Sequence, residues 1–300
     1  MTLVGVDDAA VRADFDRMLR DLRPKLHRYC ARMTGSVIDG EDVLQDALVK
    51  AVDTFAKLAS AENREAWLFR IAHNAALDFL RRRARREAGR SDEDIAMVVD
   101  RSSQTDERIA ATANLRTFLR LPVAQRSSVI LMDVLGYSLE EIGGVLDATI
   151  PSVKANLHRG RTRLRELANE PDDQPLPALS QSERTLLRAY VDRFNARDFE
   201  AIRDMLAEEV WLDMVARARM KGPDEITAKY FRNYGLADDW RLALGVVDGR
   251  PALVVSDPAD PNRRIAYFVE LTWAGERISR IRDFRYARYV ADGAEAHLLE

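Results

Sequence analysis

The sequence predicts a multidomain protein in which two all-helical domains, the second a helix-turn-helix, precede an α+β domain. Apolar residues recur at spacings of three and four as far as about residue 168, which is the period of an amphipathic helix. A proline-rich segment at 169–182 then interrupts this pattern. Beyond it, runs rich in Val, Ile, Tyr, Phe and Trp are separated by glycine turns, as in β-strands. A chain of 300 residues is long enough for at least two domains.

The composition is typical of a soluble globular protein, with 32% charged and 47% hydrophobic residues. The sequence has no apolar run long enough to span a membrane, and its amino terminus lacks the apolar stretch of a signal peptide. The single cysteine, Cys30, excludes an internal disulfide framework, and the four histidines are too scattered to predict a metal site. We therefore expect a cytoplasmic protein with no metal, no cofactor and no membrane partner.

The first helical domain is expected at residues 1–88, with helices over about 9–33, 39–58 and 64–86. Trp67 stands beside Leu68 and Ile71 in the third helix, which favours a core position for it over base stacking. The second helix is predicted to bury one apolar stripe, made of Val43, Leu44, Ala47, Leu48, Ala51, Val52 and Phe55. Residues 89–110 then lose the helical period and become acidic, which predicts a flexible linker.

The second helical domain is expected at residues 111–168 and has the signals of a helix-turn-helix. Ser138 stands three residues before Glu141, a capping box that begins a short helix through Leu146. After a turn, Pro151 takes a first-turn position in a longer helix that runs to Ala168. A short capped helix, a turn and a longer second helix are the parts that a DNA-reading motif requires.

Basic side chains concentrate in both helical domains, at 81–86 and at 154–165. A helical wheel of the longer second helix places Val153, Leu157 and Leu164 on its inner face. The outer face and its flanks then carry Pro151, Ser152, Ala155, His158, Arg159 and Thr162, with Lys154, Arg161, Arg163 and Arg165. Small outer residues let a helix approach base edges, Arg159 could bond a guanine edge, and basic flanks could bind phosphates. A solvated face on a plain helical hairpin is the alternative.

Two motifs resemble the extracytoplasmic-function family of bacterial sigma factors. The first is similar to that family's −10-reading domain and runs Asp42-Val43-Leu44-Gln45-Asp46-Ala47-Leu48-Val49-Lys50-Ala51, then Trp67-Leu68-x-x-Ile71-Ala72-x-Asn74-x-x-x-Asp78-x-x-Arg81-Arg82. The second is similar to its −35-reading domain and includes Leu121-Pro122-x-x-x-Arg126, Gly136-Tyr137-Ser138-Leu139-Glu140-Glu141-Ile142 and Ser152-Val153-Lys154-x-x-Leu157-x-Arg159-Gly160-Arg161. The sequence departs from the family at Pro151-Ser152, where a Gly-Thr pair is usual, and at Gly143-Gly144, which replaces helix formers.

The resemblance implies a role for each matched surface. Binding and melting of the promoter −10 region is implied for Arg64, Arg70, Asn74, Asp78, Arg81, Arg82, Arg83 and Arg85. Reading of the −35 region is implied for Pro151, Ser152, Lys154, Ala155, His158, Arg159, Thr162 and Arg163. The implied partners are promoter DNA and core RNA polymerase, at its β′ clamp and β flap regions. Docking on the polymerase is implied for Asp42, Gln45, Asp46 and Lys50, and −10 specificity for the loop 59–63.

Residues 183–292 resemble the SnoaL-like family, which has the shape of ketosteroid isomerase. The resemblance rests on the segments 190–199, 206–214, 221–226 and 278–284. It implies a curved sheet wrapped by helices around a conical cavity, which could hold a small-molecule ligand. The candidate pocket residues are Trp211, Asp213, Tyr230, Tyr234 and Trp240, with Phe231 and Trp273 as further aromatic candidates. Residues 293–300 are expected to form a tail.

The function of this third domain is expected to be control of the helical domains in cis. Asp213 is the best-placed acid for proton transfer, but the domain offers it no paired histidine, so catalysis is not expected. A short linker would keep the domain close to the helical domains. Residues 168–300 contain 19 Lys or Arg and 24 Asp or Glu, and this net negative charge would favour contact with basic surfaces.

The sequence as a whole predicts a sigma factor rather than an enzyme. Such a protein binds core RNA polymerase and directs promoter recognition, DNA melting and transcription initiation. A stand-alone helix-turn-helix regulator is one alternative, and a SnoaL-like enzyme with a DNA-binding leader is the other.

Overall fold

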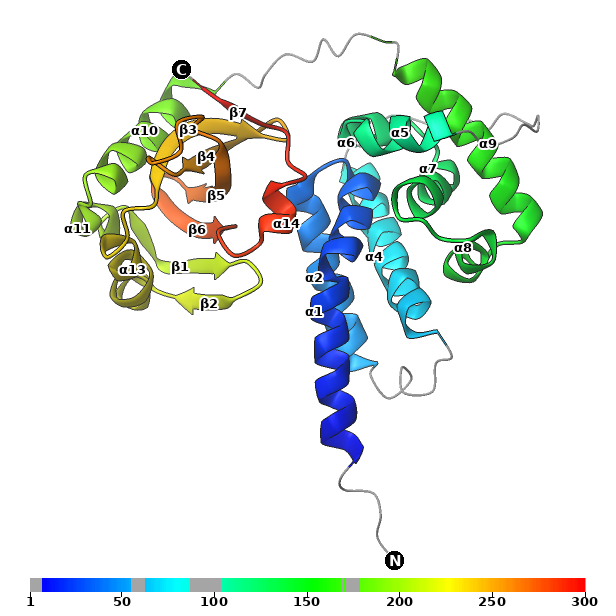
Figure 1. Cartoon of the computed structure of the whole chain (residues 1–300). Coiled ribbons are helices and arrows are strands. Elements are labelled where there is room, and N and C mark those ends of the chain that lie inside the picture. Colours follow the sequence, from blue (N-terminus) through cyan, green and yellow to red (C-terminus); the bar gives the residue numbers. More distant parts are fainter. Residues whose placement is uncertain (1–6, 55–62, 87–103, 169, 171–178, 300) are drawn as a thin grey trace, which may run out of the picture. The chain divides into compact units, whose positions relative to one another are not determined.

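The computed structural model describes residues 7–54, 63–86, 104–168, 170 and 179–299 (Figure 1). The chain divides into two compact units, 1–172 and 173–300, and each has its own hydrophobic core. Within the described ranges, every helix is too short or too polar to cross a membrane. We refer to the two units as the helical unit and the carboxyl-terminal unit.

The helical unit begins with three long helices, as the apolar periodicity predicts. These are α1 (Asp7–Thr34), α2 (Val37–Asp53) and α4 (Arg64–Arg86). Between α1 and α2 the chain turns at Gly35, whose φ of 76° suits glycine, and the Ser36 side chain accepts hydrogen bonds at the start of α2. A Cβ at Gly40 would lie 2.6 Å from the Ala31 backbone, so glycine lets α1 and α2 cross closely.

The predicted buried stripe of α2 needs one correction. Val43, Leu44 and Ala47 are buried, but Val52 is 46% exposed. The helix ends at Asp53 instead of continuing to about residue 58, and Val52 in its last turn lies away from the packed face. Phe55, the last predicted member of the stripe, lies outside the described residues.

The second half of the helical unit consists of shorter elements. They are α5 (Gln104–Thr112), α6 (Leu115–Leu119), α7 (Val123–Val129), the π-helical η1 (Ile130–Val134), α8 (Leu139–Leu146) and α9 (Ile150–Leu167). Helix α5 starts inside the segment 89–110, which we expected to be a flexible linker with room for a short helical patch. Within α5, Asp106 is buried and bonds Arg165 at 2.8 Å, and Ala110 is buried in the core.

The helix-turn-helix has the predicted caps. Ser138 and Glu141 make both hydrogen bonds of the capping box, and Thr149 caps α9 with Pro151 in its first turn. The departure at Gly143 has a steric reason, because a Cβ there would lie 2.9 Å from the Ala148 carbonyl oxygen. The same glycine that weakens α8 therefore permits the tight turn into α9.

The two helical regions, 7–86 and 104–168, share a single hydrophobic core. Their joint contains Arg126, which is 5% exposed. Its guanidinium donates to the carbonyl oxygen of Met33 at 2.7 Å and to those of Leu119 and Leu121 at 3.1 and 2.9 Å. The two predicted helical domains thus lie within one compact unit.

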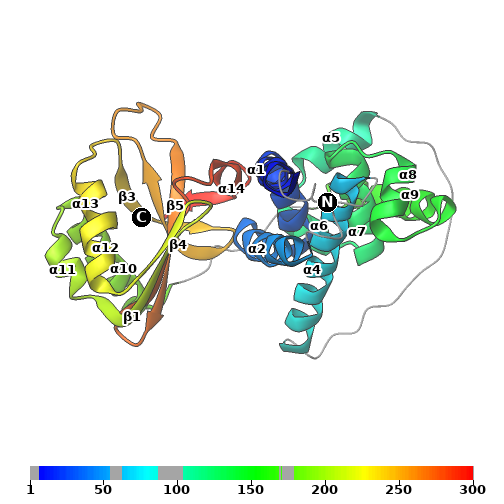
Figure 2. The same cartoon turned by 90° about the horizontal axis from the view of Figure 1, so that it is seen from below.

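The carboxyl-terminal unit is an α+β fold built on a curved seven-stranded sheet (Figure 2). Its strands are β1 (Leu206–Met214), β2 (Ala218–Lys221), β3 (Arg241–Val247), β4 (Arg250–Ser256), β5 (Ile265–Ala274), β6 (Arg277–Asp283) and β7 (Ala296–Leu298). The order is β2-β1-β6-β5-β4-β3-β7, with β1 parallel to β6 and the other neighbours antiparallel. The expected tail thus contains a strand, since Ala296–Leu298 pairs with β3 at the sheet edge.

Helices cover one side of this sheet and complete the core. They are α10 (Gln181–Asn195), α11 (Phe199–Arg203), α12 (Pro223–Ile226), the π-helical η2 (Thr227–Phe231) and α13 (Arg232–Gly235). In Figure 2, α10 to α13 lie together beside the sheet. A further helix, α14 (Arg288–Ala291), lies apart from them. Phe194 of α10 stands at the centre, with its ring edge-on to Tyr234 at 5.0 Å and to Trp240 at 5.1 Å. The predicted fold class is confirmed for both units.

Candidate functional site

One face of α4 presents most of the residues predicted to bind the −10 region. Arg70, Asn74, Asp78, Arg81, Arg82 and Arg85 are all exposed and follow helical spacing. The two other predicted residues are partly buried and paired, Arg64 with Asp14 at 3.4 Å and Arg83 with Asp39 at 4.0 Å. The exposed set therefore forms a continuous polar face with a basic end, and Arg64 and Arg83 lie at its margins.

Ion pairs connect this face to the residues predicted to dock on polymerase. Lys50 on α2 lies 3.6 Å from the Asp78 carboxylate on α4, and Arg82 lies 3.4 Å from Asp46. All four side chains are about half exposed, so each pair contributes at most about 1 kcal/mol. The two predicted sites are therefore adjacent surfaces on neighbouring helices.

The exposed face of α2 also contains apolar side chains that sequence analysis did not select. Val49 is 61% exposed and Val52 is 46% exposed. Both follow Asp42, Gln45 and Asp46 at helical spacing, so they share one face with these polar residues. The exposed face of α2 is therefore partly apolar and partly acidic. The helical wheel could have revealed Val49, whereas Val52 was misassigned because the end of α2 was placed too late.

The predicted −35 reader is the first half of α9. Val153, Leu157 and Leu164 are buried, which confirms the inner face. Pro151, Ser152 and Lys154 are exposed, and Ala155, His158, Arg159, Thr162 and Arg163 are partly exposed. A Cβ at Gly160 would lie 2.7 Å from Val129, so this glycine lets α9 pack directly on α7. The Arg159 guanidinium lies along the helix and donates to the Asn156 side chain at 3.2 Å.

Two of the predicted phosphate-binding flanks have structural partners. Arg161 forms a two-point ion pair with the buried Asp133, with Nε at 2.9 Å from a carboxylate oxygen. Arg165 bonds the buried Asp106 at 2.8 Å. These partners are 28 and 59 residues away in the sequence, so a wheel of α9 alone could not identify them. Lys154 is exposed, and Arg163 pairs with Glu166 on the same helix at 2.8 Å while 41% of its side chain stays exposed.

A polar cluster joins α4 to the turn before α8. Lys25 Nζ lies 2.7 Å from Glu65 Oε1, and the Tyr137 hydroxyl donates to the same oxygen. The Lys25 ammonium also lies 4.2 Å from the centre of the Tyr137 ring, which is edge-on to Phe69 at 5.1 Å. Partial burial opposes ionisation of Glu65, but the hydrogen bonds from Lys25 and Tyr137 outweigh it and lower the pKa of Glu65.

The aromatic pocket candidates of the carboxyl-terminal unit surround a buried acid that sequence analysis did not single out. Tyr230 and Tyr234 donate hydrogen bonds to Asp283 at 2.8 and 2.7 Å, and Tyr267 lies 3.0 Å from the Tyr234 hydroxyl. Burial raises the pKa of Asp283 although these tyrosines and the Arg285 backbone N–H, at 2.7 Å, favour its ionised form. Tyr230, Tyr234 and Trp240 are each 5% exposed or less, so they form core rather than an open wall.

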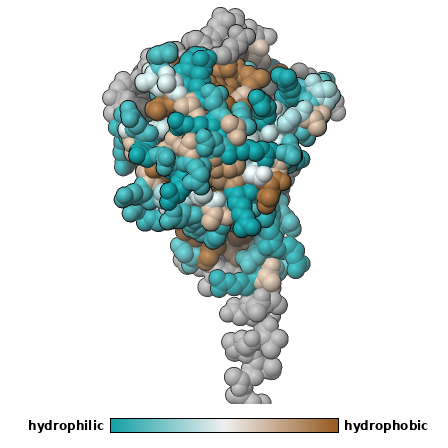
Figure 3. All heavy atoms as spheres, turned by 90° about the vertical axis from the view of Figure 1, so that its left-hand side faces the viewer, coloured by the Kyte–Doolittle hydropathy of each residue, from teal (hydrophilic) through white to brown (hydrophobic). Residues whose placement is uncertain are grey.

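Trp211 and Asp213 do not join these aromatics. Val210 and Leu212 of β1 pack into the core of the unit, and successive strand residues alternate between faces, so Trp211 and Asp213 lie on the opposite face. Asp213 stands 3.6 Å from Arg219 and 3.9 Å from Arg280 there. Trp211 is 48% exposed and contacts Lys221. Figure 3 shows that polar residues cover most of the viewed face of the carboxyl-terminal unit, with a group of hydrophobic residues near its top and smaller ones near its centre.

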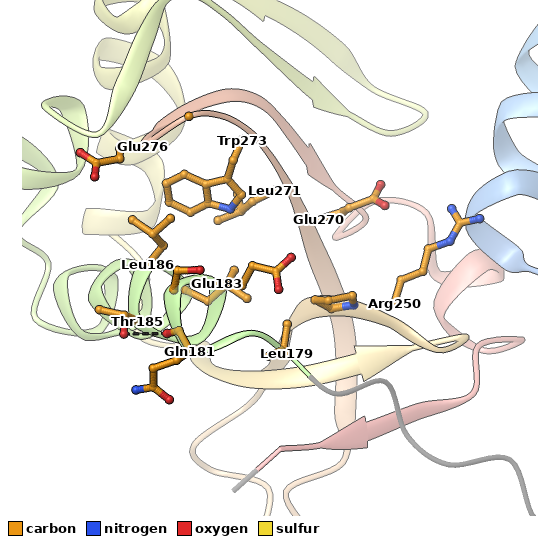
Figure 4. Close-up of a pocket in the computed structure, with 14 residues that line it drawn as sticks. Leu179, Gln181, Glu183, Thr185, Leu186, Arg250, Glu270, Leu271, Trp273 and Glu276 are labelled. Carbon is orange, nitrogen blue, oxygen red and sulfur yellow. Dashed lines mark hydrogen bonds between the residues drawn. The ribbon is translucent and has the colours of Figure 1, made fainter.

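The cavity of the unit lies elsewhere, between the start of α10 and strands β4 and β5 (Figure 4). Its volume is about 910 Å³. Of the aromatic residues considered from sequence, Trp273 lines it and the others do not. The contribution of Leu186 and Leu187 on α10, and of Leu179 just before it, could not be inferred from sequence, because these residues lie far from β5 along the chain.

Comparisons with known proteins agree with the two helical motifs. The sigma-70 region 2 model matches residues 18–86, and the sigma-70 region 4 model matches residues 115–164. The ECF RNA polymerase sigma factor SigM of Mycobacterium tuberculosis is 34% identical over 165 residues, which cover 55% of this chain and 82% of SigM. SigG of the same species, also an ECF RNA polymerase sigma factor, is 25% identical over 304 residues, covering 91% of this chain and 81% of SigG.

Among solved structures, the sigma factor RpoE in complex with the anti-sigma factor NepR from Bartonella quintana matches at 26% identity. It covers 54% of this chain and 99% of RpoE, with a TM-score of 0.41. Regions 2 and 4 stand in the same order and at the same segments as the two motifs, and SigM is matched over most of its length. This chain therefore belongs to the extracytoplasmic-function family of RNA polymerase sigma factors.

Proposed function

We propose that this sigma factor docks on core RNA polymerase through α2, opens the promoter −10 region with α4 and reads the −35 region with α9. The observation that carries the proposal is the exposed face of α4. Its six exposed residues combine three arginines near the carboxyl end of the helix with amide and carboxylate groups nearer the middle. A basic track can follow the displaced strand, and hydrogen-bonding groups beside it can hold an extruded base.

Reading of the −35 region is assigned to the amino-terminal half of α9. Ser152, Ala155 and His158 are small or polar and reach solvent, so they suit contact with base edges. Lys154 and Arg163 flank them and suit contact with phosphates. Arg161 and Arg165 are left out of this role, because Asp133 and Asp106 occupy their guanidinium groups.

Docking on core polymerase is assigned to the exposed face of α2. Val49 and Val52 would supply the apolar contact, and Asp42, Gln45 and Asp46 the polar rim around it. By the family resemblance the partner surface is the β′ clamp, and region 4 would contact the β flap.

Promoter binding would separate the two helical regions, because α4 and α9 would each have to reach a different element of the promoter duplex. In the free protein α4 and the turn before α8 touch through Glu65 and Tyr137. We expect that contact to break when polymerase and promoter hold the regions at their working distance.

The carboxyl-terminal unit would control these steps in cis. It is a compact unit with its own core, tethered to the helical unit by the chain around residue 172. Tethering keeps its local concentration near the DNA-binding surfaces at about the millimolar level. An isomerase-type role for Asp213 has no support, since that acid lies on the sheet face away from the aromatic core and beside two arginines.

Run-off transcription with purified core polymerase tests the proposal. The full chain and a chain ending at Asp172 are compared on a promoter library, since residues 1–172 form a compact unit. Promoter-dependent transcripts are expected from at least the shorter chain, and the difference between the two gives the sign of control. DNA binding without transcripts from either chain would favour a stand-alone regulator instead.

Single variants separate the −10 surface from the polymerase-docking surface. Arg70→Ala and Arg85→Ala should each weaken promoter binding and reduce the salt dependence by about one phosphate contact. Val49→Glu should weaken binding to core polymerase about tenfold and spare binding of −35 duplex. The controls are Arg232→Ala and Leu236→Glu, which make the same changes at exposed positions of the carboxyl-terminal unit. Equal effects of variant and control would contradict the assigned surfaces.

A further inference from the structure

The cavity of the carboxyl-terminal unit has the size of a small-molecule site. Its volume of about 910 Å³ lies within the range of roughly 300 to 1,000 Å³ that such sites occupy. It opens between the first turns of α10 and the adjoining ends of β4 and β5 (Figure 4). All of its lining residues belong to this one unit.

The inner wall of the cavity is apolar and partly flat. Leu271 and Trp273 of β5 lie on the same strand face as Tyr267 and Val269, which are core residues. In Figure 4 the Trp273 indole stands over the cavity with Leu271 behind it, and Leu186 of α10 lies opposite. These side chains form a slot that suits a planar hydrocarbon group.

The charged groups that line the cavity are mainly acidic. Three carboxylates, of Glu183, Glu270 and Glu276, line it with one guanidinium, of Arg250. In Figure 4 the carboxylates of Glu183 and Glu270 lie on the side of the cavity toward Arg250, and Glu276 points away. The Glu270 carboxylate lies 3.3 Å from the Arg282 guanidinium, whereas the Glu183 carboxylate is bonded to Ser180.

Glu183 is held as an anion at the mouth of the cavity. Its carboxylate accepts hydrogen bonds from the Ser180 hydroxyl at 2.6 Å and the Ser180 backbone N–H at 2.9 Å. These bonds lower the pKa of Glu183 and fix its position at the start of α10. A carboxylate and an indole that line the same cavity can together recognise an organic ammonium group, through charge and through cation–π attraction.

We propose that this cavity binds a small amphipathic cation, with a planar apolar body against Trp273 and Leu186 and an ammonium group toward Glu183 and Glu270. The ligand bridges the first turn of α10 to strand β5, and α10 is the first helix after the connection to the helical unit. The use of this ligand as a control signal rests on the proposed cis regulation, whereas the binding of the ligand to the cavity does not.

Calorimetric titration of the full chain tests the site with three matched probes. They are 2-naphthylmethylamine, which is cationic at neutral pH, the uncharged 2-naphthylmethanol and the anionic 2-naphthoate. The amine is expected to bind at least fivefold more tightly than the alcohol, and the carboxylate more weakly than either. Naphthoate binding as tight as the amine, or no heat of binding from the amine, would overturn the proposal.

Matched variants locate the site. Trp273→Ala should weaken amine binding at least tenfold, and Glu183→Gln, which keeps a capping-box side chain, should weaken it about threefold to tenfold without affecting the alcohol. The controls are Trp211→Ala and Glu209→Gln, whose residues lie outside the cavity lining. Unchanged amine affinity in Trp273→Ala would show that the probe binds elsewhere and reject the assignment.

Run-off transcription with and without the amine separates this proposal from the proposed function. Binding that leaves transcription by the full chain unchanged would retain the cation site and reject its role in control. Transcription that differs between the full and shortened chains, together with absent amine binding, would retain cis control and reject the site.

Discussion

An acidic side chain accepts a hydrogen bond from a tyrosine in both units of this sigma factor, but the two acids respond in opposite ways. Glu65 in the helical unit has Lys25 at 2.7 Å, its side chain is 38% exposed, and its pKa is lowered. Asp283 in the carboxyl-terminal unit is 1% exposed and is bonded to two tyrosines, and its pKa is raised. The nearby Arg285 uses its guanidinium on Asp239, at 2.8 and 2.9 Å.

The contrast indicates different tasks for the two clusters. An ionised acid with a lysine partner can be exposed to water at little cost, so the Glu65 cluster suits a contact that forms and breaks. A buried acid surrounded by tyrosines is costly to expose or to leave without its donors, so the Asp283 cluster suits a permanent core. If the helical regions separate as proposed, the Glu65 contact is therefore a cheaper place to open than a cluster such as that of Asp283.

The largest effect is expected at Arg126, and it tests whether all contacts between the helical regions 7–86 and 104–168 are weak. Arg126→Ala should destabilise that unit by on the order of 3 kcal/mol, because the carbonyl oxygens of Met33, Leu119 and Leu121 lose a charged donor in the interior. Urea unfolding followed by hydrogen exchange reports the two units separately. Arg116→Ala, at a partly exposed arginine of α6, serves as the control. If the free energy of unfolding fell by less than about 0.5 kcal/mol, water would be replacing the Arg126 hydrogen bonds, and the contacts between the two helical regions would be weak as a whole.

A matched pair of hydroxyl deletions sharpens the comparison. Tyr234→Phe should cost about 1 to 2 kcal/mol in the carboxyl-terminal unit, because it leaves a buried carboxyl without one donor. Tyr137→Phe should cost about 0.5 kcal/mol in the helical unit, since water can reach Glu65. Tyr286→Phe, at a tyrosine that is 46% exposed, should change neither unit. Equal losses at Tyr234 and Tyr137 would remove the distinction between the two clusters.

The features that could be predicted from sequence are those set by neighbouring residues. The capping box of Ser138 and Glu141, the inner face of α9 and the long helices depend on spacings of three and four, and all were correctly placed. Helix ends were less accurate, as Val52 shows, because the end of an element depends on what packs against its last turn.

Features that depend on distant residues could not be predicted. Arg161 and Arg165 look like phosphate-binding residues until Asp133 and Asp106 are brought beside them. The face of the sheet on which Trp211 and Asp213 lie depends on strand register, and one residue of register reverses it. The strand β7 has three residues, too few to show any alternation. The cavity could not be predicted either, because α10 and β5 lie far apart in the sequence and meet only in the folded unit.

The smallest expected effect is on the pH dependence of stability, where the two acids should give slopes of opposite sign. The folded pKa of Glu65 is lowered, so its stabilising contribution is complete above about pH 4.5 and is lost as the pH falls through the folded value. The folded pKa of Asp283 is raised, so the folded state holds its proton more tightly, and the carboxyl-terminal unit loses stability as the pH rises from about 3.8 toward that value. Each slope is a fraction of the roughly 1.4 kcal/mol per pH unit that one full proton would give. Glu65→Gln should flatten the slope of the helical unit below about pH 4.5, and Asp283→Asn that of the carboxyl-terminal unit above about pH 3.8, as hydrogen exchange from about pH 3 to pH 7 would measure. A carboxyl-terminal slope that Asp283→Asn leaves unchanged would show that Asp283 is already ionised in the folded protein, and the contrast between the two clusters would then rest on burial alone.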